Sequence, residues 1–350
     1  MRVVVVGATG NVGTSVLRAL SAEPQVDSIV GVARRVSDWH LEKVEWQAAD
    51  IRSSNLVALF EGADVVVHLA WLIQPSRDHA ELRSVNVEGS ARLFDAVAEA
   101  QVPALVYASS VGAYSPGPKD RAVDESWPTD GIQSSFYARH KAEVERLLDR
   151  FEQDHPEVRS VRLRPALIFK REAGSEIRRL FAGPFLPSRL VRKEAIPVVP
   201  DIPRLRFQAV HSYDVGEAYR LVALGDAAGA FNIAADPVLD PPELARLLDA
   251  RTVPVPAGLV RTVADLSWRL RLQPTPPGWV DMALAVPIMD PSRARKELGW
   301  EPRRSSGEAV LDVLAGIRES PGEETPPLAA DAGGPARARE IATGVGRENP

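Results

Sequence analysis

The chain opens with an apolar run that passes directly into a glycine string: Val3-Val4-Val5-Val6-Gly7-Ala8-Thr9-Gly10-Asn11-Val12-Gly13. Four consecutive valines predict a strand that is buried on both faces, because a half-exposed strand alternates apolar and polar residues. The glycines allow a sharp turn, and a helix starting there offers unpaired N–H groups and a positive dipole end. Although the spacing Gly-x-x-Gly-x-x-Gly differs from the commonest fingerprint, this strand–turn–helix predicts a dinucleotide site.

The first 170 residues alternate short β-branched runs with longer helical patterns. This alternation predicts βαβ units and a parallel sheet with helices on both faces. We therefore predict an α/β fold with a Rossmann-type doubly wound parallel sheet. Strands are expected at residues 3–6, 28–32, 44–48, 65–68, 105–108 and 161–163, and helices at 12–20, 56–60, 85–100 and 136–151.

The pattern changes after residue 170. Residues 171–318 are richer in proline and arginine, and we interpret them as a smaller, less regular substrate lobe with segments that return to the main sheet. Residues 319–350 contain almost no large apolar side chain, so they are expected to form a disordered tail. The predicted domains are a dinucleotide-binding Rossmann domain over 1–170, the lobe over 171–318 and the tail over 319–350.

Composition excludes several classes of protein. A net charge of −5 gives no electrostatic basis for binding nucleic acid. The absence of cysteine excludes disulfides and thiol chemistry, and the six histidines show no paired ligand spacing, so no metal is expected. No apolar run approaches the ~20 residues of a membrane span. We expect a cytoplasmic protein with a small-molecule substrate and no membrane partner.

The end of the second expected strand indicates which cofactor binds. A carboxylate there would hold the ribose 2′-hydroxyl of NAD, but the chain has Arg34 and Arg35, which suit a 2′-phosphate. NADP(H) is therefore favoured over NAD(H), with NAD binding beside two solvated arginines as the alternative. Asp50, at the end of the third strand, is placed to accept from the adenine amino group, and His68 is interpreted as a core histidine.

Three further residues form a candidate catalytic group. Ser110 follows the fifth strand, and Tyr137 and Lys141 lie four apart on one face of the next helix. Tyr137 would exchange a proton with the substrate oxygen and Ser110 would hydrogen-bond that oxygen. An ammonium ~5 Å from the phenol supplies about 3 kcal/mol toward the phenolate at an effective dielectric of ~20, so Lys141 is expected to lower the pKa of Tyr137.

These motifs, in this order, resemble the NAD-dependent epimerase/dehydratase family, the extended branch of the short-chain dehydrogenases. The resemblance extends over residues 1–318 and includes the segments 107–114, 210–215 and 298–302. It implies that Ser110, Tyr137 and Lys141 are catalytic. With the residues already discussed, it gives as cofactor-binding candidates Gly7, Thr9, Gly10, Asn11, Val12, Gly13, Arg34, Arg35, Asp50, Ile51, Leu69, Ala70, Asn86, Tyr137, Lys141 and Pro165.

The substrate is left open by the sequence. Residues 166–207 lack the asparagine usual in nucleotide-sugar members, which favours a smaller or more apolar substrate, with Trp71, Gln74 and Tyr114 as candidate contacts. The preferred hypothesis is an NADP(H)-dependent carbonyl or alcohol oxidoreductase. The alternatives are an epimerase or dehydratase acting on a sugar or sugar nucleotide, and a non-catalytic NADP(H)-sensing regulator. By analogy with the family, a homodimer through the helices at 85–100 and 136–151 is expected.

Overall fold

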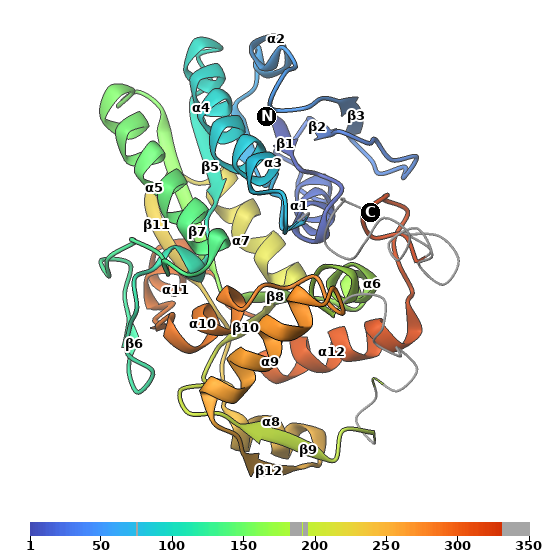
Figure 1. The fold of residues 1–350 in the computed structure, drawn as a ribbon. Coiled ribbons are helices and arrows are strands. Elements are labelled where there is room, and N and C mark those ends of the chain that lie inside the picture. The colour runs from blue at the N-terminus through green and yellow to red at the C-terminus, as the bar shows by residue number, and fades with distance from the viewer. Residues whose placement is uncertain (75, 183–190, 192–194, 331–350) are drawn as a thin grey trace.

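A seven-stranded parallel sheet forms the centre of the molecule (Figure 1). The computed structural model describes residues 1–74, 76–182, 191 and 195–330. The strand order is β3-β2-β1-β4-β5-β7-β11 and all neighbouring strands are parallel. This confirms the predicted doubly wound α/β fold. The strands are β1 (Arg2–Val6), β2 (Ser28–Ala33), β3 (Val44–Ala48), β4 (Val65–His68), β5 (Ala104–Ala108), β7 (Arg159–Pro165) and β11 (Gly229–Ile233).

Helices cover both faces of the sheet, which explains the unbroken valine run. Val3 and Val5 pack toward α1 (Asn11–Ser21) and α7 (Ser212–Leu224), whereas Val4 and Val6 pack on the other face. That second face is covered by α2 (Leu56–Phe60), α4 (Gly89–Glu99) and α5 (Phe136–Asp154). The four valine side chains are all but inaccessible to solvent, so burial on both faces replaces the alternating pattern of an exposed sheet.

The second lobe lies below the carboxyl edge of the sheet in Figure 1 and contains three two-stranded parallel pairs. As expected, some of its chain returns to the main sheet: β11 extends the sheet and α7 packs on α1. The remaining strands are β6 (Ala122–Val123), β8 (Leu167–Phe169), β9 (Val198–Asp201), β10 (Ala209–His211), β12 (Arg251–Pro254) and β13 (Ile288–Met289). The further helices are α3 (His79–Arg83), α6 (Gly174–Ile177), α8 (Pro241–Leu248), α9 (Ala257–Arg269), α10 (Gly278–Ala285), α11 (Ser292–Leu298) and α12 (Ser306–Glu319).

The helix expected at residues 85–100 begins differently. It is preceded by α3 and by a π-helical turn, Ser84–Glu88, before α4 begins at Gly89. The buried side chain of Asn86 lies in this turn and holds the loop after β4, accepting from the N–H of Leu72 at 2.7 Å and donating to its carbonyl at 2.8 Å. Periodicity alone does not distinguish such a turn from an α-helix.

The segment 321–330, part of the expected disordered tail, makes contacts with the rest of the protein. Leu328 and Thr325 are buried, and the Glu323 carboxylate pairs with the buried ammonium of Lys170 at 3.2 Å. The hydroxyl of Ser37 donates to the carbonyl of Glu324 at 2.8 Å. A count of large apolar residues does not take such polar and ionic contacts into account. Residues 331–350 lie outside the described part.

The described residues contain no helix long and apolar enough to cross a membrane. In that same part of the chain, no group of three or more histidine and carboxylate side chains is placed to hold a metal ion.

Candidate functional site

The glycine turn after β1 forms as predicted from the sequence. Gly7 adopts a φ of 90°, and a Cβ there would lie 2.6 Å from the backbone nitrogen of Ala70. A Cβ on Gly13 would overlap the carbonyl oxygen of Gly7, so both positions require glycine. Gly10 caps α1, whose first N–H groups are left for an anion.

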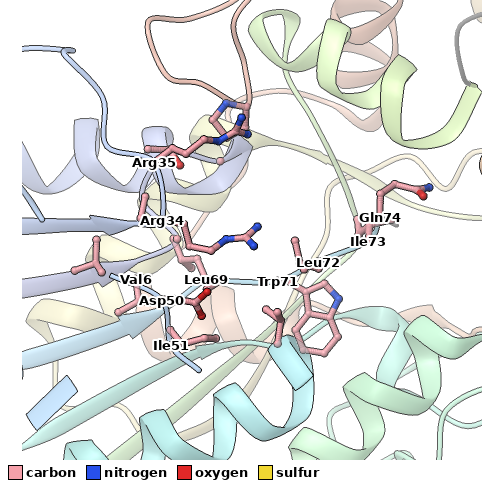
Figure 2. A pocket seen from close by; sticks show the side chains of 18 of the residues that line it. Val6, Arg34, Arg35, Asp50, Ile51, Leu69, Trp71, Leu72, Ile73 and Gln74 are labelled. Atoms are coloured by element: carbon pink, nitrogen blue, oxygen red, sulfur yellow. The ribbon is translucent and has the colours of Figure 1, made fainter. Parts of the chain in front are cut away.

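A cavity of about 230 Å³ opens beside this turn, at the carboxyl ends of β1, β2 and β3 (Figure 2). This edge is where parallel α/β sheets bind ligands. Nine predicted cofactor residues line the cavity: Gly7, Thr9, Gly10, Arg34, Arg35, Asp50, Ile51, Leu69 and Ala70. The turn and these residues fit the adenosine and pyrophosphate portions of a dinucleotide. The side-chain oxygen of Asn11 at the start of α1 is buried and has no partner among the described residues, which leaves one acceptor for a ligand.

The end of the cavity beside β2 and β3 carries two arginines, Arg34 and Arg35. Figure 2 shows the Arg34 side chain between those of Arg35 and Asp50. Arg52 binds the Asp50 carboxylate at 2.7 Å and is the main reason that the pKa of Asp50 is lowered, with a smaller contribution from Arg34. Asp50 therefore lines the cavity as predicted, but it is already engaged by a guanidinium.

The structure brings the three candidate catalytic residues together. Ser110 follows β5, and its side chain lies close enough to Tyr137 on α5 to oppose the rise in the pKa of that phenol. The Ser110 hydroxyl also accepts from the N–H of Gly112 at 3.0 Å. The Lys141 ammonium lies 5.9 Å from the centre of the Tyr137 ring. Gly112 makes this packing possible, because a Cβ there would lie 2.9 Å from the ring of Tyr137.

Trp71 separates this trio from the cavity. Its ring centre lies 3.5 Å from the Lys141 ammonium and 5.9 Å from the Tyr137 ring centre. On the other side of Tyr137, the Trp279 ring of α10 lies at 4.9 Å. Both indole N–H groups are buried without a partner in the described part of the chain, so each is a donor for a ligand oxygen. Trp71 thus lines the cavity and contacts Lys141 and Tyr137, at the boundary between the cavity and the trio.

The expected lowering of the Tyr137 pKa does not occur. Burial raises the pKa of Tyr137 to about 12, although the hydrogen bond with Ser110 opposes that rise. Burial also lowers the pKa of Lys141 well below its usual value, and its ammonium donates to the carbonyl of Ala108 at 2.6 Å. The prediction weighed the charge of Lys141 and neglected the loss of water around both groups.

A buried ionic network supports the trio from behind. Glu145, one turn after Lys141, accepts hydrogen bonds from Ser109, Arg162 and Arg164. Burial by itself raises the pKa of Glu145, but the hydrogen bond and charge of Arg164, together with Arg162, lower it to about 2. This network joins the end of β5 to the helix that carries Tyr137 and Lys141. Sequence reasoning missed it, although the spacing of four residues from Lys141 was a usable signal.

Two predicted substrate contacts have other partners. Tyr114 is fully buried, and its hydroxyl donates to the Asn232 side chain at 2.6 Å and accepts from Arg164 at 3.1 Å, away from the cavity. Gln74 lines the cavity but donates to the carbonyl of Leu180 at 2.9 Å, which ties the loop after β4 to the second lobe.

His68 has the environment of a core histidine. Its ring lies 2.8 Å from the Ser90 hydroxyl, and burial is the main cause that lowers its pKa to about 3. Of the other candidates, Val12 and Gly13 lie in the first turn of α1 and Pro165 ends β7. They shape the backbone around the cavity without lining it, and Asn86 likewise acts through the loop it holds.

The second lobe and the tail contribute residues that no sequence pattern singled out. Glu176, Arg179 and Leu180 line the cavity, and so does Pro327. Burial raises the pKa of Glu176 to about 7, with Arg179 and Lys170 opposing. Arg179 donates to the carbonyl of Pro327 at 2.9 Å, which closes the cavity between the lobe and the segment 321–330.

Comparison with known proteins identifies the family. The NAD dependent epimerase/dehydratase family matches residues 3–234. The chain is 27% identical over 324 residues to an uncharacterised protein of Mycobacterium tuberculosis, a match that covers 91% of this chain but 30% of that protein. It is 33% identical over 110 residues to the L-arabinose 1-dehydrogenase (NAD(P)(+)) of Haloferax volcanii, which covers 31% of this chain and 41% of that enzyme.

The fold is also similar to that of UDP-glucose 4-epimerase from Thermus thermophilus, solved in complex with NAD. The TM-score is 0.66 at 20% identity, over 91% of this chain and 99% of that one. The chain thus belongs to the NAD-dependent epimerase/dehydratase family. The predicted resemblance is confirmed, and a nicotinamide dinucleotide is the cofactor of this class.

Proposed function

We propose that this enzyme transfers hydride between NADP(H) and a carbonyl or alcohol substrate, with Ser110, Tyr137 and Lys141 as its catalytic residues. The observation that carries the proposal is the assembly of these three side chains at the same sheet edge as the dinucleotide cavity. A bound nicotinamide supplies or accepts the hydride. The protein's own residues hold the substrate oxygen and move the proton.

The Tyr137 phenol is in the protonated form that reduction of a carbonyl requires. With a pKa of about 12, the phenol stays protonated throughout the neutral range, as a group that donates a proton to a carbonyl oxygen must. Ser110 hydrogen-bonds the same oxygen as negative charge develops on it. Lys141 is held by the carbonyl of Ala108 and contacts Trp71 at the boundary of the cavity.

The aromatic surroundings of Tyr137 support a largely apolar substrate. Trp71 and Trp279 flank the phenol, and Phe181 packs edge-on against Trp279 at 4.9 Å. Such walls favour a substrate that is apolar next to its reacting carbon. The indole N–H groups of Trp71 and Trp279, which have no partner among the described residues, can donate to polar atoms of that substrate.

One observation favours the epimerase or dehydratase alternative. The segment 321–330 contributes Pro327 to the cavity and is anchored at Lys170 and Arg179. A cofactor enclosed in this way exchanges slowly, which suits an enzyme that oxidises and restores its cofactor within one cycle. We keep this as the second candidate, acting on a sugar or sugar nucleotide.

The cofactor preference is tested at Arg34 and Arg35. In the double variant Arg34→Gln/Arg35→Gln, loss of two guanidinium contacts to a 2′-phosphate should raise the KM for NADPH by at least about tenfold and leave that for NADH nearly unchanged. Arg150→Gln, an exposed arginine of α5, is the matched control. The preference for NADP(H) is contradicted if the wild-type enzyme uses NADH as well as NADPH and the KM for NADPH is unchanged in the double variant.

A further inference from the structure

Helix α9 (Ala257–Arg269) presents an aliphatic face to solvent. Leu259, Val263, Leu266 and Leu270 are 55%, 58%, 56% and 60% exposed. Their spacing of four, three and four residues places them along one side of the helix and its C-cap. Eight large apolar residues are exposed on the described surface, and five of them lie between positions 259 and 272. Exposed apolar side chains are therefore concentrated in this segment.

The opposite, inner side of α9 anchors the helix to the protein. Val260, Ala264 and Trp268 are partly buried there, toward α10. The guanidinium of Arg77 stacks over the Trp268 ring at 4.2 Å and also donates to the Trp268 carbonyl. These contacts turn the aliphatic side of α9 away from the rest of the protein and toward solvent.

The charges around this face are predominantly basic. Residues 251–272 contain four arginines, Arg251, Arg261, Arg269 and Arg271, and one acidic residue, Asp265. Arg269 pairs with Asp265 at 2.9 Å and Arg261 with Asp281 of α10 at 2.8 Å. This leaves Arg251 and Arg271 without a salt bridge among the described residues. The whole chain carries a net charge of −5, so this segment is basic within an acidic protein. An aliphatic side joined to an arginine-rich polar side is the pattern of a helix that lies in the interface of a lipid bilayer. The arginines suit anionic headgroups.

The size of the face argues against a second copy of this chain as its occupant. Five half-exposed aliphatic side chains offer roughly 500 Å², less than the ~800 Å² that each partner buries in a standard protein interface. Insertion into a lipid surface needs no complementary partner surface, because the apolar side chains enter the boundary between headgroups and acyl chains.

The chain leads from this face to the candidate substrate site. After α9 the chain passes through Pro274, whose carbonyl accepts from Ser76 and Gln74 of the loop after β4. It then enters α10, where Trp279 lies 4.9 Å from the Tyr137 ring. One segment thus connects the aliphatic surface with the wall of the candidate substrate site.

We propose that the outward face of α9 and its C-cap, formed by Leu259, Val263, Leu266 and Leu270, together with Leu272 just beyond the helix, docks the enzyme reversibly on anionic lipid surfaces. Arg251 and Arg271 contact the headgroups and the aliphatic side chains enter the interface. This inference concerns association with a surface and stands independently of the proposed reaction. It departs from the expectation, drawn from the sequence, of no membrane partner.

Co-sedimentation of the full chain with lipid vesicles tests the proposal. Wild-type protein should sediment with phosphatidylcholine vesicles that contain phosphatidylglycerol and much less with phosphatidylcholine alone. Val263→Ser/Leu266→Ser should weaken partitioning by at least about tenfold, because two apolar side chains no longer enter the interface. Leu167→Ser, which alters an exposed leucine elsewhere, should leave it unchanged. Arg251→Gln/Arg271→Gln should reduce binding only to the anionic vesicles.

Circular dichroism and dinucleotide binding confirm that each variant is folded. The proposal is overturned if wild-type protein sediments with neither kind of vesicle, or if Val263→Ser/Leu266→Ser binds as well as wild type. It is also overturned if the protein is a dimer without lipid and this double variant is a monomer, since the face then joins two copies.

Discussion

At the scale of single residues, Glu145 determines how the catalytic trio is held. Its carboxylate is inaccessible to solvent and lies between the guanidinium groups of Arg162 and Arg164, while Ser109 donates a further hydrogen bond. Buried ion pairs contribute little net stability when both partners are replaced, but removal of one partner leaves the other charge unsatisfied. The geometry of Ser110 and Lys141 thus depends on a group that does not contact the substrate.

We predict that Glu145→Gln lowers the free energy of unfolding by about 3 kcal/mol, because Arg164 keeps a buried charge without a carboxylate. The pKa of Glu145 is lowered from 4.5 to about 2 in the folded state. Its stabilising contribution is therefore fully present above about pH 4.5 and is lost as the pH falls toward 2. Urea unfolding at neutral pH and at pH 3 measures both effects. Equal stability of variant and wild type at neutral pH contradicts this account.

At the scale of elements, sequence patterns predicted the strand–turn–helix around Gly7 and the placement of Tyr137 and Lys141 on one helix face. Both depend on local geometry, which spacing encodes directly. The position of Trp71 over Lys141 and the raised pKa of Tyr137 were not predictable, since they depend on burial by α10 and by the loop after β4. Contacts between segments far apart in sequence leave no periodic signal.

Gly13→Ala should weaken dinucleotide binding by at least about tenfold and destabilise the fold by ~1–3 kcal/mol, because its Cβ would overlap the Gly7 carbonyl and displace α1 from β1. Gly258→Ala, where a Cβ meets no atom within 4 Å, is the matched control and should bind as wild type. Fluorescence titration with NADPH and thermal unfolding give the two readouts. Unchanged affinity in Gly13→Ala would falsify the assignment of this turn to the cofactor.

At the scale of the whole molecule, the second lobe and the segment 321–330 close the cofactor cavity from the side opposite the sheet. Lys170 at the end of β8 joins Thr14 of α1 at 2.6 Å and Glu323 at 3.2 Å, so one buried ammonium connects three distant parts of the chain. Composition predicted disorder in the segment 321–330 because a count of apolar residues does not include ion pairs such as that between Lys170 and Glu323. Sequence patterns located the lobe but offered no reason to expect this enclosure.

A chain ending at Glu319 should release bound dinucleotide faster, by about tenfold or more, and unfold at a lower temperature, because Leu328 no longer packs and Lys170 loses its carboxylate partner. A chain ending at Asp331 keeps the whole segment and serves as control. Stopped-flow displacement of NADPH measures the release. Identical rates in the two truncated chains would show that the segment does not retain the cofactor.

The central claim is that hydride passes between NADP(H) and the substrate while Tyr137 supplies the proton. NADPH deuterated at the transferred position, incubated with a panel of apolar ketones and aldehydes, tests it by mass spectrometry of the products. We predict an alcohol that carries one deuterium with wild type, at least about a hundredfold less of it with Tyr137→Phe at unchanged NADPH affinity, and normal yield with Tyr213→Phe. The claim is contradicted if Tyr137→Phe transfers as much deuterium as wild type. It is also contradicted if the wild-type enzyme transfers no deuterium to any carbonyl and the label stays on the cofactor.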